Sequence, residues 1–192
     1  MISPYDGLEE SEWKSKTSEL VKEHPLDQKE IKKVVLDCWK CILNTAIGDY
    51  KIGRDIFQKP QIIGLFLHEL ICLEISKMDP ETWGCEKKPS DKDIVNLKNA
   101  RYSIEVKTSS HKSKIFGNRS YAKAAGKSTK SKSGYYLAIN FEKFKPGGDE
   151  PRVLKIRFGW IDHEDWSGQA AESGQQANLP VSVERYKLVE IQ

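Results

Sequence analysis

The sequence predicts an α/β fold in which a mixed central β-sheet is flanked by helices. Helical patterns fill roughly residues 1–80, and strand patterns dominate roughly residues 90–160. Few helical patterns separate these strands, so few of them can be joined by βαβ crossovers and the sheet should contain antiparallel pairs. The chain has 192 residues, 38% of them hydrophobic, which is enough to build the core of one domain.

The N-terminal part contains the predicted helices. Residues 7–23 are polar and helix-permissive, as in a surface helix. Residues 26–47 begin with Asp27 and Glu30, which are spaced as a capping box. The apolar residues that follow form one helical stripe: Ile31, Val34, Val35, Cys38 and Ile42. Residues 62–78 are apolar on most sides, so this third helix is expected to pack between other layers.

The C-terminal half contains the predicted strands. Residues 93–97 and 102–106 are two short apolar runs around a Lys-Asn-Ala turn, which predicts a hairpin. Residues 135–141 are almost continuously apolar, as in a central strand covered on both faces. Residues 153–160 alternate between apolar and polar side chains, and residues 185–191 are expected to form a short edge strand.

Basic side chains are concentrated in one segment. Between Lys107 and Lys132 there are seven Lys, one Arg and no Asp or Glu, whereas the whole chain has a formal net charge of only +3. Such a segment on a mildly acidic body predicts a polyanionic partner, and the alternative is a solvated loop without a partner. The N-terminal residues lack the apolar core of a signal peptide. The longest apolar stretch is interrupted by His68 and Glu69, so no membrane contact is expected.

The four cysteines are Cys38, Cys41, Cys72 and Cys85. Cys38 and Cys41 form a CxxC within a helical pattern, but Cys72 and Cys85 lack the close spacing of a second zinc-binding pair. We therefore expect reduced thiols in the core of a cytosolic protein rather than a zinc site.

Asp93, Glu105 and Lys107 lie in the predicted hairpin. Folding the hairpin about Asn99 places Asp93 opposite Glu105 on one face, with Cβ atoms about 5 Å apart. Two unpaired carboxylates at that distance repel each other, and a divalent cation that prefers oxygen ligands, such as Mg²⁺, removes the repulsion. Lys107 lies on the same face, where its ammonium can bind a phosphate oxygen or orient a water molecule. The alternative is a surface cross-strand pair of Glu105 and Lys107 without a catalytic role.

An Asp followed about a dozen residues later by Glu-x-Lys resembles the signature of the PD-(D/E)XK nuclease superfamily. The corresponding stretch here is SDKDIVNLKNARYSIEVK, with the proline displaced to Pro89. We assign the aspartate to Asp93, because it immediately precedes the apolar residues of a strand, and Asp91 is the alternative. Further phrases resemble the ScaI-like group of type II restriction endonucleases over roughly residues 60–180: IEVKTSS, FGNRSYA, KSKSGYYLAINFEKF, IRFGWIDHEDW and GQAAESGQQANL.

This resemblance implies a restriction-endonuclease-like fold with a PD-(D/E)XK core, as a single catalytic and DNA-binding domain over residues 1–192. It implies a Mg²⁺-dependent enzyme that cuts double-stranded DNA at a short palindromic site, leaves 5′-phosphate ends and acts as a homodimer. It also implies a cytoplasmic prokaryotic protein with a cognate DNA methyltransferase. The alternatives are a DNA repair or junction-resolving nuclease of the same superfamily and a DNA-binding module without catalysis.

Members of the superfamily often add a carboxylate from the preceding helix, and Glu69 is the candidate here, both as a catalytic residue and as a metal ligand. It shares a helical face with four apolar residues, so we expect that face to be buried and Glu69 to reach the metal: Ile62, Leu65, Phe66 and Leu73. The alternative is a structural ion pair with a lysine. A zinc-protease motif is excluded because HELIC lacks the second histidine of HExxH.

Residues after the catalytic strand are candidates for DNA contacts. Asn118 and Arg119 lie side by side, and Arg119 either reads a guanine edge or binds a phosphate. Ser109 contacts a phosphate through its hydroxyl or forms a turn. Gln175 reads an adenine edge or lies on a polar helix surface. The lysines are expected to bind phosphates, which position the duplex without reading its sequence: Lys112, Lys114, Lys123 and Lys127.

Overall fold

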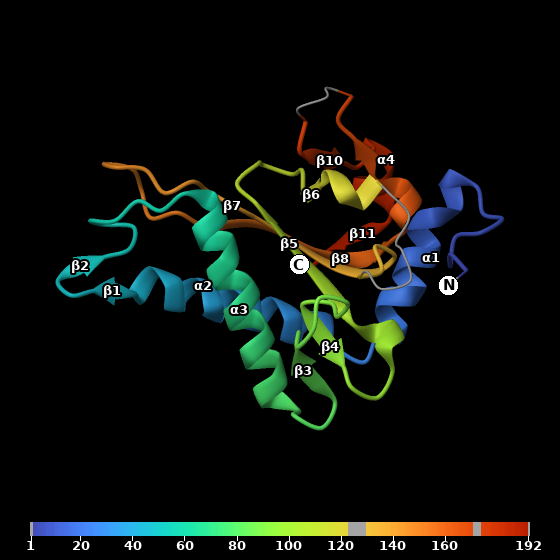
Figure 1. The fold of residues 1–192 in the computed structure, drawn as a ribbon, viewed down its shortest axis with the longest axis horizontal. Helices are drawn as coiled ribbons and strands as arrows, with labels where there is room; N and C mark the ends of the chain where they lie inside the picture. The colour runs from blue at the N-terminus through green and yellow to red at the C-terminus, as the bar shows by residue number, and fades with distance from the viewer. Residues whose placement is uncertain (1, 123–129, 171–173, 192) are drawn as a thin grey trace.

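The computed structural model describes residues 2–122, 130–170 and 174–191 of the chain. Its centre is a six-stranded sheet (Figure 1). From one edge to the other its strands are β11 (Leu188–Glu190), β8 (Val153–Ile161), β7 (Gly134–Phe141), β5 (Ile104–Ser109), β4 (Ile94–Asn96) and β3 (Trp83–Cys85). β5 and β7 run parallel, and the other neighbouring strands of this sheet run antiparallel. The predicted mixed sheet is therefore confirmed.

The helices are α1 (Glu10–Glu23), α2 (Gln28–Asn44), α3 (Pro60–Met78) and the short α4 (Val181–Tyr186), with 3-10 turns at Ala100–Tyr102, Arg119–Ala122 and His163–Asp165. α2 begins with the predicted capping box of Asp27 and Glu30, and its predicted apolar stripe is buried. A small hairpin of β1 (Ala46–Ile47) and β2 (Tyr50–Lys51) follows α2. Among the described residues, no helix combines the length and the hydropathy that crossing a membrane requires.

β7 is the buried centre of the sheet, as its apolar run predicts. Tyr135, Leu137 and Ile139 pack into one hydrophobic cluster together with residues of α1, α2 and α3. Tyr136 and Ala138, which alternate with them, belong to a second cluster on the opposite face. Side chains of a strand point alternately to its two faces, so a strand with apolar residues at every position needs cover on both.

The cover on the second face includes a three-stranded sheet, β6–β10–β9, that the sequence did not predict. β10 (Gln176–Asn178) pairs antiparallel with β6 (Phe116–Asn118) and with β9 (Ser167–Gly168), and Figure 1 shows β6 and β10 side by side. Gly117 of β6 pairs with Ala177 of β10, and this pair lies on the inner face of the small sheet. Tyr121 and Trp166 pack against it there. Gln175 directly precedes β10, so the alternative that it lies on a polar helix surface is wrong.

α3 is buried on one side only, so the prediction that it packs between layers is wrong. The buried residues of α3 are Ile63, Gly64, Leu67, Ile71, Cys72 and Ile75. The exposed apolar residues of its opposite side are Ile62, Leu65, Phe66 and Leu73. Hydropathy records how apolar each face is, but not whether another layer lies over it. On its inner side the helix comes close to β5, because a Cβ atom built on Gly64 would lie 2.5 Å from Oγ1 of Thr108.

Cys72 on α3 and Cys85 on β3 form a disulfide, with Cα atoms 5.6 Å apart. The prediction of reduced thiols is therefore wrong for this pair. α3 packs against β3 and so brings together two residues that thirteen positions separate. The sequence argument tested only for closely spaced zinc ligands and missed this pairing. Cys38 and Cys41 are free thiols, the first buried and the second exposed.

Candidate active site

Asp93 and Glu105 lie next to each other on the hairpin of β4 and β5. Ile94 pairs with Ile104 across the two strands, which is the register that the sequence predicts. Oδ2 of Asp93 accepts a hydrogen bond from the backbone N–H of Val106 over 2.6 Å. This bond fixes the position of the Asp93 carboxylate beside the strand that carries Glu105.

Asp91 has a different position. Its side chain accepts hydrogen bonds from the backbone N–H groups of Lys87 and Lys88, at 3.2 and 3.3 Å. These bonds close the turn that precedes β4. The geometry therefore favours Asp93 over Asp91 as the partner of Glu105.

Lys107 contacts Glu105 directly. Its Nζ lies 2.7 Å from Oε1 of Glu105, and the hydroxyl of Tyr121 donates to the same oxygen. Nζ of Lys107 also lies 4.7 Å from the centre of the Tyr121 ring. The two charged side chains are 14% and 2% exposed. An exposed surface pair, which was the alternative interpretation, does not describe this arrangement.

Lys130 was not predicted from the sequence, yet it contacts both carboxylates. Its Nζ lies 2.9 Å from Oδ1 of Asp93 and 2.9 Å from Oε2 of Glu105. A third carboxylate, that of Glu86, lies 3.4 Å away. The sequence contains no spacing signal for Lys130, which reaches the site from the loop before β7 and was only one of seven lysines in a basic segment.

Positive charge sets the protonation state of Glu105. Burial alone would raise the pKa of its carboxyl group, but Lys107, Lys92 and Lys130 outweigh that effect and hold this pKa well below its usual range. Burial also lowers the pKa of Lys92 to about 8. Burial would lower the pKa of Lys130, but the attraction of Glu105 and Asp93 for its ammonium is the larger effect and raises this pKa. Glu105 is therefore ionised, which is the form of a carboxyl group that binds a metal ion.

The arrangement of oxygens fits a divalent cation that prefers hard ligands. Oδ1 of Asp93 and Oε2 of Glu105 converge on a single positively charged atom. Oε2 is buried and accepts no hydrogen bond of good geometry among the described residues, so it retains lone pairs for a metal. No group of three or more His, Cys, Asp or Glu that could hold a metal ion is found in the described part of the chain. The protein would thus supply two carboxylates, and water or substrate the remaining ligands, as is usual for Mg²⁺.

Glu69 does not join the site. It is exposed, on the side of α3 that the fold leaves uncovered, because the face predicted to be buried is not. His68, one residue earlier, faces the carboxylates instead, and its Nδ1 lies 3.7 Å from Oδ2 of Asp93. Burial lowers the pKa of His68, although Asp93 opposes the shift. The helix was predicted correctly, but the face that points toward the site was not.

A groove of about 830 Å³ is lined in part by His68, the residue whose ring lies 3.7 Å from the Asp93 carboxylate. Among its lining residues are His68 and Thr108 near the catalytic strand, and Asn118 and Gln176 on the three-stranded sheet. Ser109 also lines it, and the Ser109 hydroxyl accepts a hydrogen bond from the backbone N–H of His111. The groove therefore extends from His68, next to Asp93, to the exposed side chains of Asn118 on β6 and Gln176 on β10.

The other predicted DNA-binding residues are more dispersed. Lys112 is exposed, and Gln175 lines a separate pocket beside β9 and β10. The guanidinium of Arg119 donates a hydrogen bond to the carbonyl of Gly174, 3.3 Å away. Lys123 and Lys127 lie outside the described residues.

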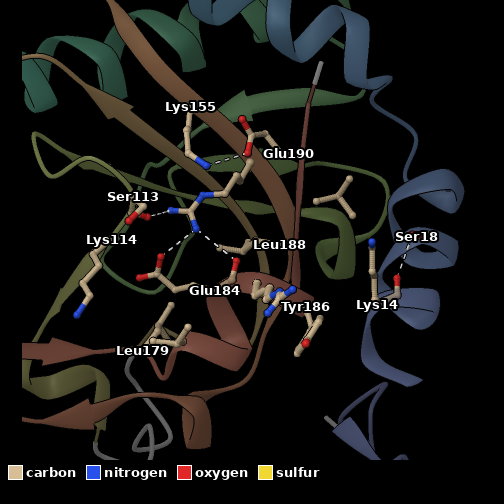
Figure 2. A pocket seen from close by; sticks show the side chains of 14 residues that line it. Lys14, Ser18, Ser113, Lys114, Lys155, Leu179, Glu184, Tyr186, Leu188 and Glu190 are labelled. Atoms are coloured by element: carbon tan, nitrogen blue, oxygen red, sulfur yellow. Dashed lines mark hydrogen bonds and ion pairs between the residues drawn. The ribbon is translucent and has the colours of Figure 1, made fainter. Parts of the chain in front are cut away.

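Lys114 borders another pocket, of about 520 Å³ (Figure 2). Ion pairs occupy its wall. Lys155 lies 3.0 Å from Glu190, and Nη1 of Arg157 lies 2.9 Å from Glu184. None of the residues that line this pocket belongs to the carboxylate site. Lys114 therefore lies at a different pocket from the one that Ser109 and Asn118 line.

Comparisons with known proteins give matches that cover nearly the whole chain. A family model described as ScaI restriction endonuclease matches residues 3–192. A curated relative, the type II restriction enzyme ScaI of Streptomyces caespitosus, is 43% identical over 192 residues, which cover 98% of this chain and 84% of that enzyme. No solved structure matches the chain.

Proposed function

The chain belongs to the ScaI restriction endonuclease family, and we propose that it acts as a type II restriction enzyme that hydrolyses double-stranded DNA with the help of Mg²⁺. The observation that carries this proposal is the meeting of Asp93, Glu105 and Lys107 at one largely buried site. Two ligands for a divalent cation and an adjacent ammonium are the groups that hydrolysis of a phosphodiester uses.

Asp93 and Glu105 would hold the ion through Oδ1 and Oε2, the two oxygens that face a cation in the structure. When bound, Mg²⁺ supplies stabilisation of the negative charge that develops on the phosphate. Lys107 and Tyr121 both contact Oε1 of Glu105 and thereby fix the direction of Oε2. This support orients the ligand before the ion binds.

Lys107 orients the attacking water. Its ammonium donates to Oε1 of Glu105 at 2.7 Å and to the carbonyl of Val106 at 3.3 Å, which leaves one of its three N–H groups for water or a phosphate oxygen. A positive charge at this position favours the hydroxide form of the water. The oxygen of this water then forms a bond to phosphorus while the bond between phosphorus and the 3′ oxygen breaks. The 3′ oxygen takes up a proton, so the products are 5′-phosphate and 3′-hydroxyl ends.

The groove lined by His68, Asn118 and Gln176 is the proposed DNA-binding surface. Asn118 and Gln176 pair directly across β6 and β10, and both line the groove. Within the described residues, neither carboxamide is used in a hydrogen bond. A carboxamide can donate to and accept from an adenine edge in the major groove, which admits a β-ribbon. We therefore assign base contacts to this pair.

The remaining DNA-binding candidates are assigned to the backbone of the duplex. Ser109 lies in the groove and would contact a phosphate next to the site of cleavage. Arg119 and Gln175 flank the amide pair and would contact phosphates there. Lys112, Lys114, Lys123 and Lys127 would add charge-dependent affinity that is independent of sequence.

A single domain of this kind cuts one strand, so two copies are needed to cut both strands at one site. We infer that the protein acts as a symmetric homodimer on a short palindromic sequence, because a two-fold axis of the protein then matches that of the DNA. In this proposal it is a cytoplasmic prokaryotic enzyme whose host carries a DNA methyltransferase of the same specificity.

Digestion of phage DNA tests the proposal. Purified protein with Mg²⁺ is expected to give discrete fragments whose sequenced ends share one short palindrome and carry 5′-phosphates. A chelator should abolish cutting. Preference for branched substrates over linear duplex would instead indicate a junction-resolving nuclease, and binding without Mg²⁺-dependent cutting would indicate a module without catalysis.

A further inference from the structure

Lys130 occupies the position that the proposed function assigns to the metal ion. Its Nζ makes ion pairs of 2.9 Å with Oδ1 of Asp93 and 2.9 Å with Oε2 of Glu105. These are the same two oxygens that would coordinate a cation. An ammonium and a divalent ion cannot both lie between them, because they would share the same ligands and repel each other.

We propose that Lys130 is a resident cation of the metal-free site and must leave before the metal binds. This inference rests on the proposed function, since it takes Asp93 and Glu105 as the metal ligands. In the metal-free protein Lys130 removes the repulsion between the two carboxylates and keeps them converged. Lys130 is thus a positioning residue that competes with the ion.

The surroundings of Lys130 permit this movement. The backbone just after it is held in place, because Nζ of Lys92 donates to the carbonyl of Ser131 and the hydroxyl of Tyr136 donates to the carbonyl of Lys132. The side chain of Lys130 itself is a four-carbon stem with freely rotating bonds. It can therefore leave the carboxylates by rotation of the side chain while the start of β7 stays fixed.

DNA gives the released ammonium another partner. Glu86, the third carboxylate near Lys130, is 3.4 Å away and more exposed than the other two. A phosphate at the site would offer the same ammonium a further negatively charged partner. DNA should then favour release of Lys130 and so raise the affinity for metal, and by linkage metal should raise the affinity for DNA. The protein would bind its metal weakly until DNA is present.

Direct metal binding without DNA tests the competition. Mn²⁺ binding, followed by calorimetry, is expected to be at least about tenfold tighter in Lys130→Met than in the parent, because no ammonium has to be displaced. Lys132→Met is the matched control. Its Nζ lies 4.3 Å from the centre of the Tyr121 ring and makes no ion pair with either carboxylate in the described residues. This control removes the same charge from the same loop and should change Mn²⁺ affinity much less.

A measurement on the parent protein does not depend on the folding of a variant. Acylation of lysines, mapped by mass spectrometry, should modify Lys130 slowly without metal, because its side chain is only 14% exposed and ion-paired. Mn²⁺ should accelerate acylation of Lys130 and leave that of Lys132 nearly unchanged. Unaltered acylation of Lys130 at saturating Mn²⁺, or equal Mn²⁺ affinity of Lys130→Met and the parent, would overturn the competition.

Asp93→Asn separates this failure from failure of the proposed function. If Asp93→Asn binds Mn²⁺ as well as the parent does, the metal site itself is misassigned. If Asp93→Asn loses Mn²⁺ while Lys130→Met binds it no better than the parent, the metal site stands and only the role of Lys130 is wrong.

Discussion

Oδ2 of Asp93 accepts a hydrogen bond of 2.6 Å from the backbone N–H of Val106, the residue that follows Glu105. The bond joins the start of β4 to the strand that carries Glu105 and Lys107. It occupies one oxygen of Asp93 and leaves Oδ1 for a cation, and Oδ1 is the oxygen that lies 2.9 Å from Lys130. One oxygen of Asp93 is therefore used in the hairpin, and the other is the oxygen that the proposal assigns to the metal ion.

Asp93→Asn and Glu105→Gln are each expected to lower the rate of DNA cleavage by at least about 100-fold, because each removes a charged metal ligand. Binding to duplex DNA should persist or become tighter, because a negative charge is removed from the path of the phosphate. Single-turnover cleavage and fluorescence anisotropy measure the two effects separately. Asp91→Ala is the control and should cut at nearly the parental rate, since Asp91 closes a turn. A rate near that of the parent in Glu105→Gln would show that the ligand is wrongly assigned.

Lys107→Met should lower the rate of the chemical step by about 10²- to 10⁴-fold, the usual contribution of a positioned acid or base. The apparent affinity for DNA should change little, because the ammonium acts on the attacking water. Lys132→Met is again the control, because Lys132 also lies over the Tyr121 ring but does not pair with Glu105. Equal losses in the two variants would indicate that total charge, and not the position of Lys107, matters.

Asn118→Ala and Gln176→Ala should each weaken binding to the cognate duplex by about 1–3 kcal/mol and affect random DNA much less. The reason is that a bidentate amide contact exists only where the correct base is present. Lys112→Ala should instead weaken binding to all duplexes about equally. It should also reduce the slope of log affinity against log salt concentration by about one unit, the value expected for one lost phosphate contact. Titrations on cognate and random duplexes at several salt concentrations distinguish the two kinds of contact. Equal losses on both duplexes for Asn118→Ala would assign Asn118 to the DNA backbone.

His24 should make stability depend on pH. Nδ1 accepts from the N–H of Leu26, so the neutral ring donates from Nε2 to the carbonyl of Tyr102. Burial lowers the pKa of His24 to about 4, from 6.5 in the unfolded chain. Its stabilising effect is complete above pH 6.5 and is lost as the pH falls toward 4, because the unfolded chain then binds a proton that the folded chain does not. The loss amounts to about 3 kcal/mol.

Urea unfolding at pH 7 and pH 4.5 measures this loss. His24→Gln keeps a donor and an acceptor but does not titrate, so its free energy of unfolding should fall less over this range than that of the parent. A parallel fall in both proteins would show that His24 does not cause the acid sensitivity over this range. The lowered pKa of Glu105 would affect stability only at lower pH, below the pKa of a free carboxyl group.

The parts of the site that depend on local order were predictable from the sequence. The hairpin register that brings Asp93 to Glu105, and the spacing that puts Lys107 beside it, follow from the period of two along a strand. Lys130 was not predictable, because it arrives from a distant loop and its contacts depend on the complete fold. Glu69 was chosen instead of His68 because the helical pattern shows two apolar faces and does not tell which one the sheet covers.

The disulfide and the three-stranded sheet show the same limit. Cys72 meets Cys85 because α3 packs on β3, and the paired strands β6 and β10 are separated in the chain by the whole of β7 and β8. Strands of three residues carry too short an alternation to be recognised. Contacts of this kind depend on tertiary structure and leave no periodic signal.

The close approach of α3 to β5 at Gly64 has a consequence for laboratory evolution. A side chain at this position would meet Thr108 and force the helix outward, and His68, one turn later on the same helix, would move with it. A screen for slow or temperature-sensitive cutting should therefore return substitutions of Gly64, a residue without any functional group. Compensating mutations should replace Thr108 by a smaller residue, because they would restore the space between the helix and the strand.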